Sequence, residues 1–337
     1  MTLHLAIIPG MRITRRVFTP SQLEKLGRLS RKVTLNQEEG NPSPETVKRL
    51  IQGADAVITS WGCPPLDSEL LAEAPDLRAL LHAAGSVKTV VTPELWERGI
   101  QVTGAASMLS RGVAETTLGL TIASLKNMWQ IIDYTRNKDW WGFQQDSVRS
   151  RIREMFGITI GVIGAGHAGR HYIKLLQGFD VKILLSDPTY TEVQAAELGA
   201  KLVPLEELLA AADVVAVMAP EIPETYQLLN EDRLGLMKDD AILINPARGS
   251  IIHEEALIRH LKLGRFFACL DVTEPEPPAS DHPFRTLPNV VLTGHIAGAV
   301  NNGLLQIGKF ITDEWERWVQ GVPMEGRIDP VKLSFLA

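Results

Sequence analysis

Short apolar runs alternate with amphipathic stretches along most of this 337-residue chain. Apolar, β-branched runs bounded by turn residues are typical of buried strands, whereas apolar positions three or four residues apart indicate helices. In the first third, strands are predicted at 3–9, 54–60, 77–84 and 100–105, and helices at 21–29, 43–54, 67–75 and 93–99. The alternation predicts a parallel sheet covered by helices.

A second alternating block begins at Ile158, after a helical segment at 113–128 and a polar, Trp-bearing stretch at 136–155. The block predicts six strands, at 158–164, 181–187, 213–219, 241–247, 266–272 and 289–295. Six strands with intervening helices match a dinucleotide-binding unit. The segment 113–128 is apolar on several faces, which fits either a plain core helix or a helix packed against more than its own domain. A last helix is predicted at 301–321.

The most specific local pattern is ITIGVIGAGHAGR, in which Gly164, Gly166 and Gly169 follow a predicted strand and open a helix. These glycines allow a tight turn, close approach of a pyrophosphate and close packing of helix on strand. Asp187 ends the next predicted strand, where an acid suits the ribose hydroxyls of NAD and repels the 2′-phosphate of NADP. The alternative is a turn that needs glycine for packing alone.

Composition narrows the class of protein. Apolar residues make up 45% of the chain, charged residues 22%, and the net charge is −6 without a basic run. This balance argues against a nucleic-acid or anionic-membrane surface. Two distant cysteines predict neither a disulfide framework nor a zinc site and fit a reducing cytoplasm. The N-terminal apolar run is expected to be a core strand, not a signal peptide, and no run is long enough to span a membrane.

Four reactive residue types follow strands of the second block. Arg248 stands in NPARGS, Asp271 ends FFACLD, Glu276 stands in TEPEP, and His295 follows NVVLTG. Ligands bind outside the carboxyl ends of parallel strands, so these side chains are expected at one rim. Taken singly, each has a structural alternative. The arginine could cap a helix or form a surface ion pair, and the histidine could be a turn residue. Glu276 could be exposed to solvent, and Asp271 could cap the loop that follows it.

Together these motifs resemble the D-isomer-specific 2-hydroxyacid dehydrogenase family. The resemblance covers GVIGAGHAGR with Asp187, MAPEIPET, INPARGSIIHEEAL, LDVTEPEP, DHPFRTLPNVVLTGHIAG, the VAETTLGL helix and the AAGSVKT loop. It implies two Rossmann-like domains with parallel sheets. The NAD-binding domain, at 107–298, would be inserted into a flavodoxin-like substrate domain at 1–106 and 299–337. It also implies a cleft that closes over the cofactor, and a cytoplasmic homodimer formed through the nucleotide domain.

The resemblance implies that Arg248, Glu276 and His295 form the catalytic trio of an NAD-dependent enzyme that interconverts 2-oxo acids and (D)-2-hydroxy acids. The chemistry asks for these residue types. A protonated histidine can give the carbonyl oxygen a proton as hydride reaches the carbon. A glutamate on the other ring nitrogen orients the imidazole and favours its charged form, and arginine offers a planar fork to the carboxylate and polarises the carbonyl.

The remaining site residues are also carried over from the family pattern. Cofactor contacts are expected at Gly164, Gly166, His167, Ala168, Gly169, Asp187, Ala219, Pro220, Thr225, Ala247, Arg248, Asp271 and His295. Substrate contacts are expected at Ala84, Gly85, Ser86, Arg248 and His295, and no metal site is expected. His82 and Lys88, beside this substrate loop, could contact substrate, but a strand-end histidine and a solvated lysine are favoured.

The sequence departs from the family at Gly294, where proline is common, and in the substrate loop, which matches no substrate-specific version closely. Glu276 disfavours formate as a substrate, because related formate dehydrogenases carry glutamine there. An NAD-sensing corepressor on the same fold is the competing hypothesis from a different functional class. A phosphoglycerate dehydrogenase without a regulatory domain is a third.

Overall fold

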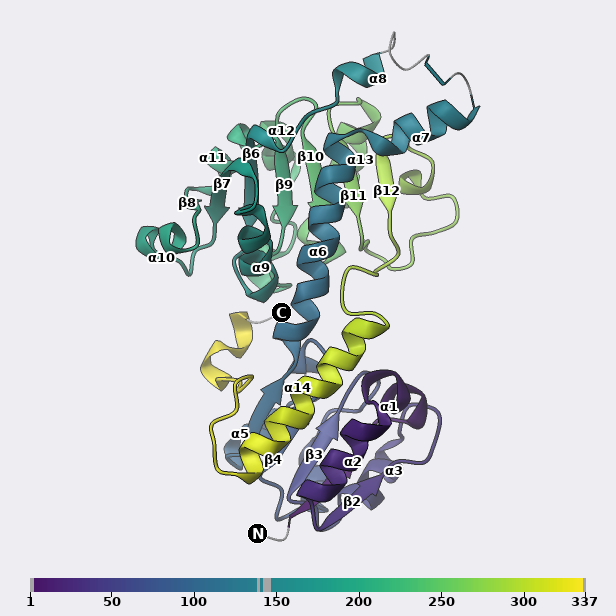
Figure 1. Ribbon diagram of the computed structural model, residues 1–337, viewed down its shortest axis with the longest axis vertical. Helices are drawn as coiled ribbons and strands as arrows, with labels where there is room; N and C mark the ends of the chain where they lie inside the picture. Colours follow the sequence, from purple (N-terminus) through teal and green to yellow (C-terminus); the bar gives the residue numbers. More distant parts are fainter. Residues whose placement is uncertain (1–2, 138–139, 142–146, 336–337) are drawn as a thin grey trace. The chain divides into compact units, whose positions relative to one another are not determined.

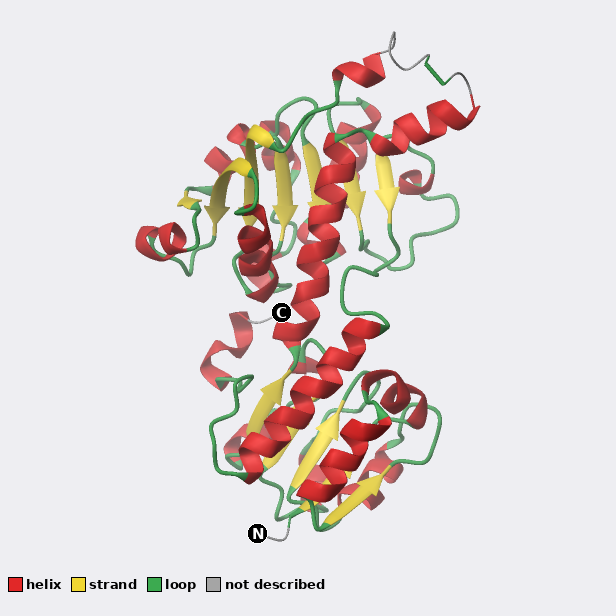
Figure 2. Ribbon diagram, in the orientation of Figure 1, coloured by secondary structure: helices red, strands yellow, loops and turns green. Residues whose placement is uncertain are grey.

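The computed structural model describes residues 3–137, 140–141 and 147–335, so parts of the Trp-bearing stretch at 136–155 lie outside the described residues. The chain divides into two compact units, one made of residues 1–110 and 299–337, the other of 111–298 (Figure 1). Each unit is an α/β layer structure in which helices lie on both faces of a parallel sheet (Figure 2).

The sheet of the first unit has five parallel strands in the order β2-β1-β3-β4-β5. Their bounds are β1 His4–Ile7, β2 Lys32–Leu35, β3 Ala56–Thr59, β4 Ala79–His82 and β5 Gln101–Gly104. This is the flavodoxin-like order of a doubly wound fold. Four of the strands were predicted. The sequence pattern missed β2, because this edge strand is short, half exposed and interrupted by Lys32 and Thr34.

Two helical layers bury the faces of this sheet. One layer contains α1 Met11–Val17, α2 Pro20–Leu29 and α14 Asn302–Val319, the other α3 Pro44–Ile51, α4 Ser68–Ala72 and α5 Pro93–Glu97. The C-terminal helix α14 places Trp315, which is fully buried, in the core of the first unit. Beyond α14 the chain runs antiparallel to β5 at Arg327 and Thr103. Buried Glu314 holds this turn by accepting hydrogen bonds from Thr103 Oγ1 at 2.6 Å and from two backbone amides, those of Glu325 and Gly326.

The second unit contains a seven-stranded parallel sheet in the order β12-β11-β10-β9-β6-β7-β8. The strands are β6 Phe156–Ile163, β7 Asp180–Ser186, β8 Lys201–Leu202, β9 Val214–Val217, β10 Ile242–Asn245, β11 Phe267–Leu270 and β12 Val290–Leu292. The order is that of the dinucleotide-binding Rossmann fold with one added strand. All six predicted strands are confirmed, and only the two-residue edge strand β8 was missed.

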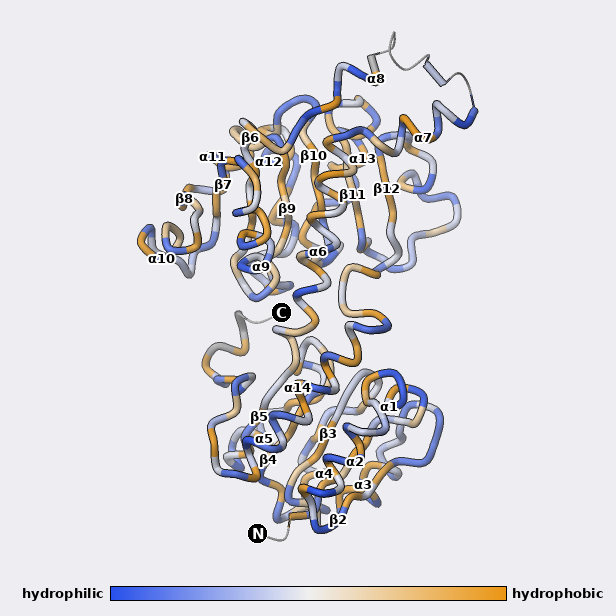
Figure 3. The backbone as a smooth tube through the Cα atoms, viewed as in Figure 1, coloured by the Kyte–Doolittle hydropathy of each residue, from blue (hydrophilic) through white to orange (hydrophobic). Residues whose placement is uncertain are grey.

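Apolar side chains form a core on each face of this second sheet. One core contains residues of α6 Ala106–Leu125 and α9 His167–Leu176, the other residues of α11 Leu205–Ala211, α12 Glu231–Leu236 and α13 Glu254–Lys262. The unit also contains α7 Met128–Asn137, α8 Ser147–Ser150 and α10 Glu192–Glu197. The central strands β9 and β10 are fully buried, and all their residues are apolar except Asn245, the last residue of β10 (Figure 3).

Helix α6 differs from its prediction at both ends. It begins at Ala106 rather than Val113 and ends at Leu125 rather than Met128. The early end has a local cause: Asn127 adopts φ 51°, a left-handed conformation that asparagine tolerates better than most residues and that stops a helix. Among the described residues, no helix has the length and apolar character that crossing a membrane requires.

Candidate active site

The glycine turn after β6 leaves the start of helix α9 open. Gly164 has φ +92°, and a Cβ there would lie 2.8 Å from the Cα of Ala219, at the end of β9. A Cβ on Gly169 would lie 2.1 Å from the carbonyl oxygen of Gly164, so helix and turn pack backbone to backbone. At Gly166, in contrast, a Cβ would meet nothing within 4 Å. The start of α9 is therefore open on this side, where its first amides could face a phosphate.

Asp187 lies at the end of β7, next to this turn, because Ile163 and Ser186 are paired in the sheet. One carboxylate oxygen accepts a hydrogen bond from the amide of Ala165 at 2.7 Å, and the other accepts from the amide and hydroxyl of Thr189. The carboxylate is half-buried and keeps lone pairs for further donors. Its negative charge suits ribose hydroxyls rather than a phosphate ester.

The other predicted cofactor residues of this half lie around the same carboxyl edge. His167 and Ala168 form the first turn of α9, where the His167 ring is exposed and its Nδ1 lies 3.3 Å from Nη2 of Arg170. Thr225 closes the loop after β9 by donating from Oγ1 to the carbonyl of Pro220 at 2.6 Å. The open helix start, the close-packed glycines and the strand-end acid together fit a dinucleotide.

Three neighbouring strands, β10, β11 and β12, carry the predicted catalytic residues. Asn245 pairs with Leu270, and Leu270 pairs with Leu292, so these three strands end side by side. The segments with Arg248, with Asp271 and Glu276, and with His295 therefore leave the sheet at one rim.

Within this rim, His295 and Glu276 are in direct contact. Nδ1 of His295 lies 2.7 Å from Oε1 of Glu276, which leaves Nε2 of the imidazole for other partners. Both side chains are accessible, with exposed fractions of 46% and 41%. A carboxylate on Nδ1 fixes the ring orientation and stabilises the imidazolium, so the pair can exchange a proton with a ligand at Nε2.

The backbone around His295 is held by Asp271. The amide of His295, at φ 59°, donates to the carbonyl of Asp271 at 2.7 Å. The Asp271 carboxylate, 3% exposed, accepts from Thr293 Oγ1 at 2.6 Å and from the amides of Ile296 and Ala297, each at 2.9 Å. The family pattern assigned Asp271 only a cofactor contact. The structure gives it the further task of fixing the loop that carries the histidine.

Arg248 is placed by a turn of its own. Buried Asn245 accepts from the amide of Ala247 and donates to the carbonyl of Arg248, which closes the turn after β10. The guanidinium contacts the Ala247 carbonyl at 2.7 Å and lies 3.8 Å from Glu221. The structure thus brings His295 and Glu276 into contact, whereas Arg248 reaches the same rim from the neighbouring strand without bonding to either of them.

The predicted substrate loop lies in the first unit, after β4. Ala84 is buried, Gly85 and Ser86 are half-buried, and Ser86 caps the short 3₁₀ helix Val87–Thr89. His82 is 1% exposed and hydrogen-bonds through Nδ1 to Thr59 Oγ1 at 2.9 Å. Burial lowers the pKa of His82 to about 4, although a hydrogen bond with the Ser86 backbone opposes this. The strand-end interpretation of His82 fits this environment.

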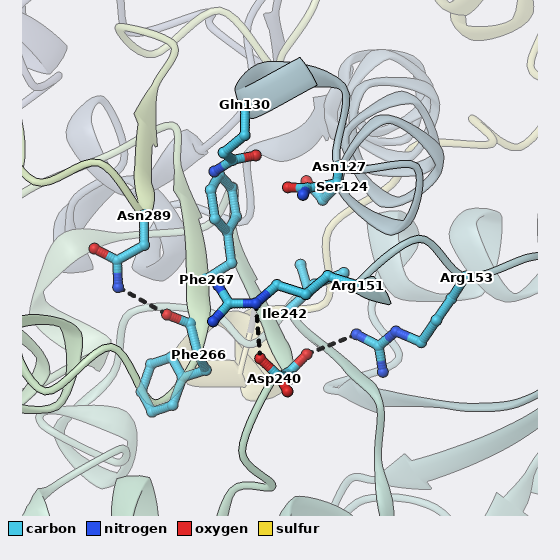
Figure 4. Close-up of a pocket in the computed structure, with 10 residues that line it drawn as sticks. All are labelled: Ser124, Asn127, Gln130, Arg151, Arg153, Asp240, Ile242, Phe266, Phe267 and Asn289. Atoms are coloured by element: carbon cyan, nitrogen blue, oxygen red, sulfur yellow. Dashed lines mark hydrogen bonds and ion pairs between the residues drawn. The ribbon is translucent and has the colours of Figure 1, made fainter. Parts of the chain in front are cut away.

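Two hollows in the second unit lie near opposite edges of its sheet. A cavity of about 530 Å³ at the carboxyl edge is lined by Asp271, Glu276, Arg285 and Gly294, among others. A hollow of about 40 Å³ lies where β10 and β11 begin (Figure 4). There Asp240 contacts two arginines: its carboxylate lies 3.4 Å from Arg151, and its backbone carbonyl accepts from Arg153 at 2.6 Å. The Arg151–Asp240 ion pair partly neutralises the charge of the smaller hollow. The volume of this hollow suits a few waters rather than a cofactor.

Sequence reasoning did not single out Asn245, Glu221 or Thr293. Asn245 and Thr293 each fix a neighbouring functional residue through side-chain hydrogen bonds. Glu221 accepts from Ser250 at 2.7 Å beside the arginine. Asn245 had a usable signal, because asparagine three residues before an arginine in a Pro-containing turn favours an Asx turn. The Thr293 contact spans 22 residues and has no local pattern.

Comparison with known proteins assigns the family. Residues 118–297 match the sequence model described as "D-isomer specific 2-hydroxyacid dehydrogenase, NAD binding domain". The chain is 31% identical over 304 residues to a glyoxylate reductase of Korarchaeum cryptofilum, covering 88% of this chain and 91% of that one. It is 35% identical over 261 residues to a glyoxylate reductase of Pyrococcus horikoshii, covering 76% and 77%. A solved phosphoglycerate oxidoreductase from Rhizobium etli is similar in fold, with TM-score 0.81, 24% identity and coverage of 97% and 98%.

The chain therefore belongs to the D-isomer-specific 2-hydroxyacid dehydrogenase family, as its motifs predicted. It is an NAD-dependent oxidoreductase that interconverts 2-oxo acids and 2-hydroxy acids, and NAD(H) is its cofactor.

Proposed function

We propose that His295 is the acid–base residue of this reaction, assisted by Glu276, and that Arg248 binds the carboxylate and polarises the carbonyl. The observation that carries the proposal is the 2.7 Å contact between His295 Nδ1 and Glu276 Oε1 at the end of β12. Bound NADH would supply a hydride to the carbonyl carbon. As negative charge grows on the carbonyl oxygen, Nε2 of the imidazolium gives that oxygen a proton. In the oxidation direction, neutral His295 accepts the hydroxyl proton.

The residues around the glycine turn would hold the dinucleotide. The open start of α9 would bind the pyrophosphate, and Asp187 the adenosine ribose. Ala219, Pro220, Thr225, Ala247 and Asp271 lie at or just beyond the ends of the neighbouring strands and would line the rest of the cofactor site. In this proposal residues 107–298 form the NAD-binding domain, and residues 1–106 with 299–337 form the substrate-binding domain. In the latter, Ala84, Gly85 and Ser86 would offer polar backbone groups to the substrate carboxylate.

The substrate class we propose is a small 2-oxo acid such as glyoxylate, with the (D)-2-hydroxy acid as product where the product is chiral. The support is that the two relatives described above are named glyoxylate reductases. The test is NADH consumption by the purified protein with glyoxylate, pyruvate, hydroxypyruvate, branched-chain and aromatic oxo acids and oxaloacetate. Turnover that is highest with glyoxylate or hydroxypyruvate supports the proposal. Fastest turnover with an aromatic oxo acid would contradict the substrate class, and NADH binding without turnover on any acid would favour a cofactor-sensing corepressor.

A homodimer formed through the second unit is part of the proposal. Helix α7 buries none of its residues, and it exposes Met128 by 42% and Ile132 by 44%. Trp140, Trp141 and Phe156 of the same unit are each more than 60% exposed. We infer that these exposed apolar side chains belong to the dimer interface, because large exposed apolar surfaces mark interaction sites. Light scattering should give twice the monomer mass, and Ile132→Glu should shift the measured mass toward that of the monomer.

The two free cysteines are buried, which accords with a reducing cytoplasm.

A further inference from the structure

The loop that carries Glu276 is short of hydrogen-bond donors. Its sequence from Thr273 is TEPEPPAS, in which three of eight residues are prolines without an amide hydrogen. A segment of this composition presents carbonyl acceptors but has few amides with which to fix itself. Within the loop, Thr273 Oγ1 donates to the carbonyl of Pro275 at 2.9 Å. Donors for the part beyond Glu276 must come from elsewhere in the chain.

Arg285 supplies two of these donors. Its Nε donates to the carbonyl of Ala279 at 2.8 Å, and its Nη2 to the carbonyl of Pro278 at 2.8 Å. The planar guanidinium is suited to this, because two of its N–H groups reach neighbouring carbonyls in a fixed geometry. Among the described residues, no carboxylate forms an ion pair with Arg285. Its side-chain hydrogen bonds therefore go to the loop.

The residues next to Arg285 are firmly anchored. Phe284 is 4% exposed and belongs to the core of the second unit. His282 hydrogen-bonds to Glu254 of α13 at 2.9 Å, and its amide donates to Ala279 at 3.1 Å. The arginine thus links the loop to this anchored segment through hydrogen bonds that span six and seven residues of the chain.

On its other side the loop lacks packing. The cavity of about 530 Å³ is lined by Glu276, Pro277 and Pro278 together with Arg285 and Gly294. Dispersion contacts that would normally hold a loop are missing where it faces a cavity. The hydrogen bonds from Arg285 to Pro278 and Ala279, together with that from the His282 amide to Ala279, therefore restrain this side of Glu276.

We propose that Arg285 is a positioning residue: by tying Pro278 and Ala279 to the core, it keeps the Glu276 carboxylate against Nδ1 of His295. The inference depends on the proposed acid–base role of that pair. Without the arginine the loop samples more conformations, and Glu276 contacts the histidine for a smaller fraction of the time. The reaction then proceeds more often with an unsupported imidazole.

The test is a double-mutant cycle of Arg285→Met and Glu276→Gln, assayed as NADH-dependent reduction of the best substrate. Arg285→Met is expected to lower kcat about tenfold, as contacting groups that act together are coupled on this scale, and to leave the Kd for NADH unchanged. In the Glu276→Gln background the same substitution should have little further effect, because Arg285 acts through Glu276. The pH–rate profile of Arg285→Met should resemble that of Glu276→Gln rather than that of the wild type.

Arg98→Met is the matched control. Arg98 in the first unit also donates to carbonyls, those of Leu71, Ala74 and Pro75. Its removal should lower the unfolding temperature about as much as Arg285→Met while leaving the pH–rate profile in place. Equal losses from Arg285→Met in both backgrounds, or no loss in either, would overturn the positioning role. Full activity of Glu276→Gln would instead overturn the proposed function itself.

Discussion

Two histidines lie at the carboxyl ends of parallel strands, and their surroundings differ: His82 is the last residue of β4, and His295 lies in the loop after β12. His82 is buried and bonded to a neutral threonine, and burial lowers its pKa to about 4, so it is uncharged near neutral pH. His295 is accessible and bonded to a carboxylate. In our proposal, access to solvent and an anionic partner, rather than a position at the end of a strand, are what make His295 reactive.

Two buried carboxylates make a parallel comparison. Asp271 accepts from a threonine hydroxyl and two backbone amides, and Glu314 of the first unit does the same. Both therefore order a loop. Only the loop ordered by Asp271 carries a side chain that we propose to act in the reaction, His295, so only its disorder should alter the chemistry.

The largest expected effect separates the two histidines. His295→Gln should lower kcat by about 10²–10⁴, the usual range for loss of a general acid, while the Kd for NADH stays within a few-fold of its original value. His82→Gln should retain most of kcat. Steady-state kinetics with NADH fluorescence titrations measures both. Equal losses of turnover and of NADH affinity in His295→Gln would mean that the histidine is structural.

Asp271→Asn tests the coupling between the buried carboxylate and the histidine. The substitution turns one acceptor into a donor that faces an amide or hydroxyl hydrogen, which should cost about 2–3 kcal/mol of unfolding free energy. Denaturant unfolding measures this loss. Glu314→Gln should lose a similar amount, yet only Asp271→Asn should also slow turnover of the folded enzyme. Slower turnover in both variants would show that general destabilisation, not the His295 loop, is responsible.

Acid should destabilise the protein through His82. The unfolded chain binds a proton at the ordinary pKa of 6.5, whereas the folded chain does so only near 4. Between these values the unfolded state holds more protons, so the unfolding free energy falls as the pH drops from 6.5 to 4, by at most about 3 kcal/mol from this residue. Denaturation midpoints of the wild type and His82→Gln across this range measure the contribution. Parallel curves for the two proteins would show that His82 does not contribute.

Asp187→Ala should have the smallest effect. Loss of one charged partner of the ribose hydroxyls is expected to weaken NADH binding about tenfold, in line with a hydrogen bond to a charged group. NADPH binding should weaken less, because repulsion of the 2′-phosphate disappears with the charge. Titration of both nucleotides checks this. A wild type that already prefers NADPH would contradict the role given to Asp187.

The features that could be predicted from the sequence are those that depend on residues close together in the chain. The glycine turn, its strand and its helix occupy one short segment, so the turn at Gly164 and the open helix start could be predicted from spacing alone. The common rim of Arg248, Glu276 and His295 followed from their positions after predicted strands and the rule that ligands bind at the carboxyl ends of parallel strands.

Contacts between distant segments could not be predicted in this way. The hydrogen bonds from Ile296 and Ala297 to Asp271 span about 25 residues and depend on how β11 and β12 pair. Arg285 donates hydrogen bonds to the carbonyls of Pro278 and Ala279. The proline-rich sequence of that loop does not indicate which residue would supply these donors. Edge strand β2 was missed because partly exposed strands lack the apolar run that marks a buried one.

The acid–base claim for His295 is tested most directly by the pH dependence of kcat/KM in both directions, in the wild type and in His295→Gln. We expect that reduction of the oxo acid slows as the pH rises and that oxidation of the hydroxy acid slows as the pH falls. Both limbs should disappear in His295→Gln. Limbs that persist in the variant, or that run in the same direction for both reactions, would contradict the central role of His295.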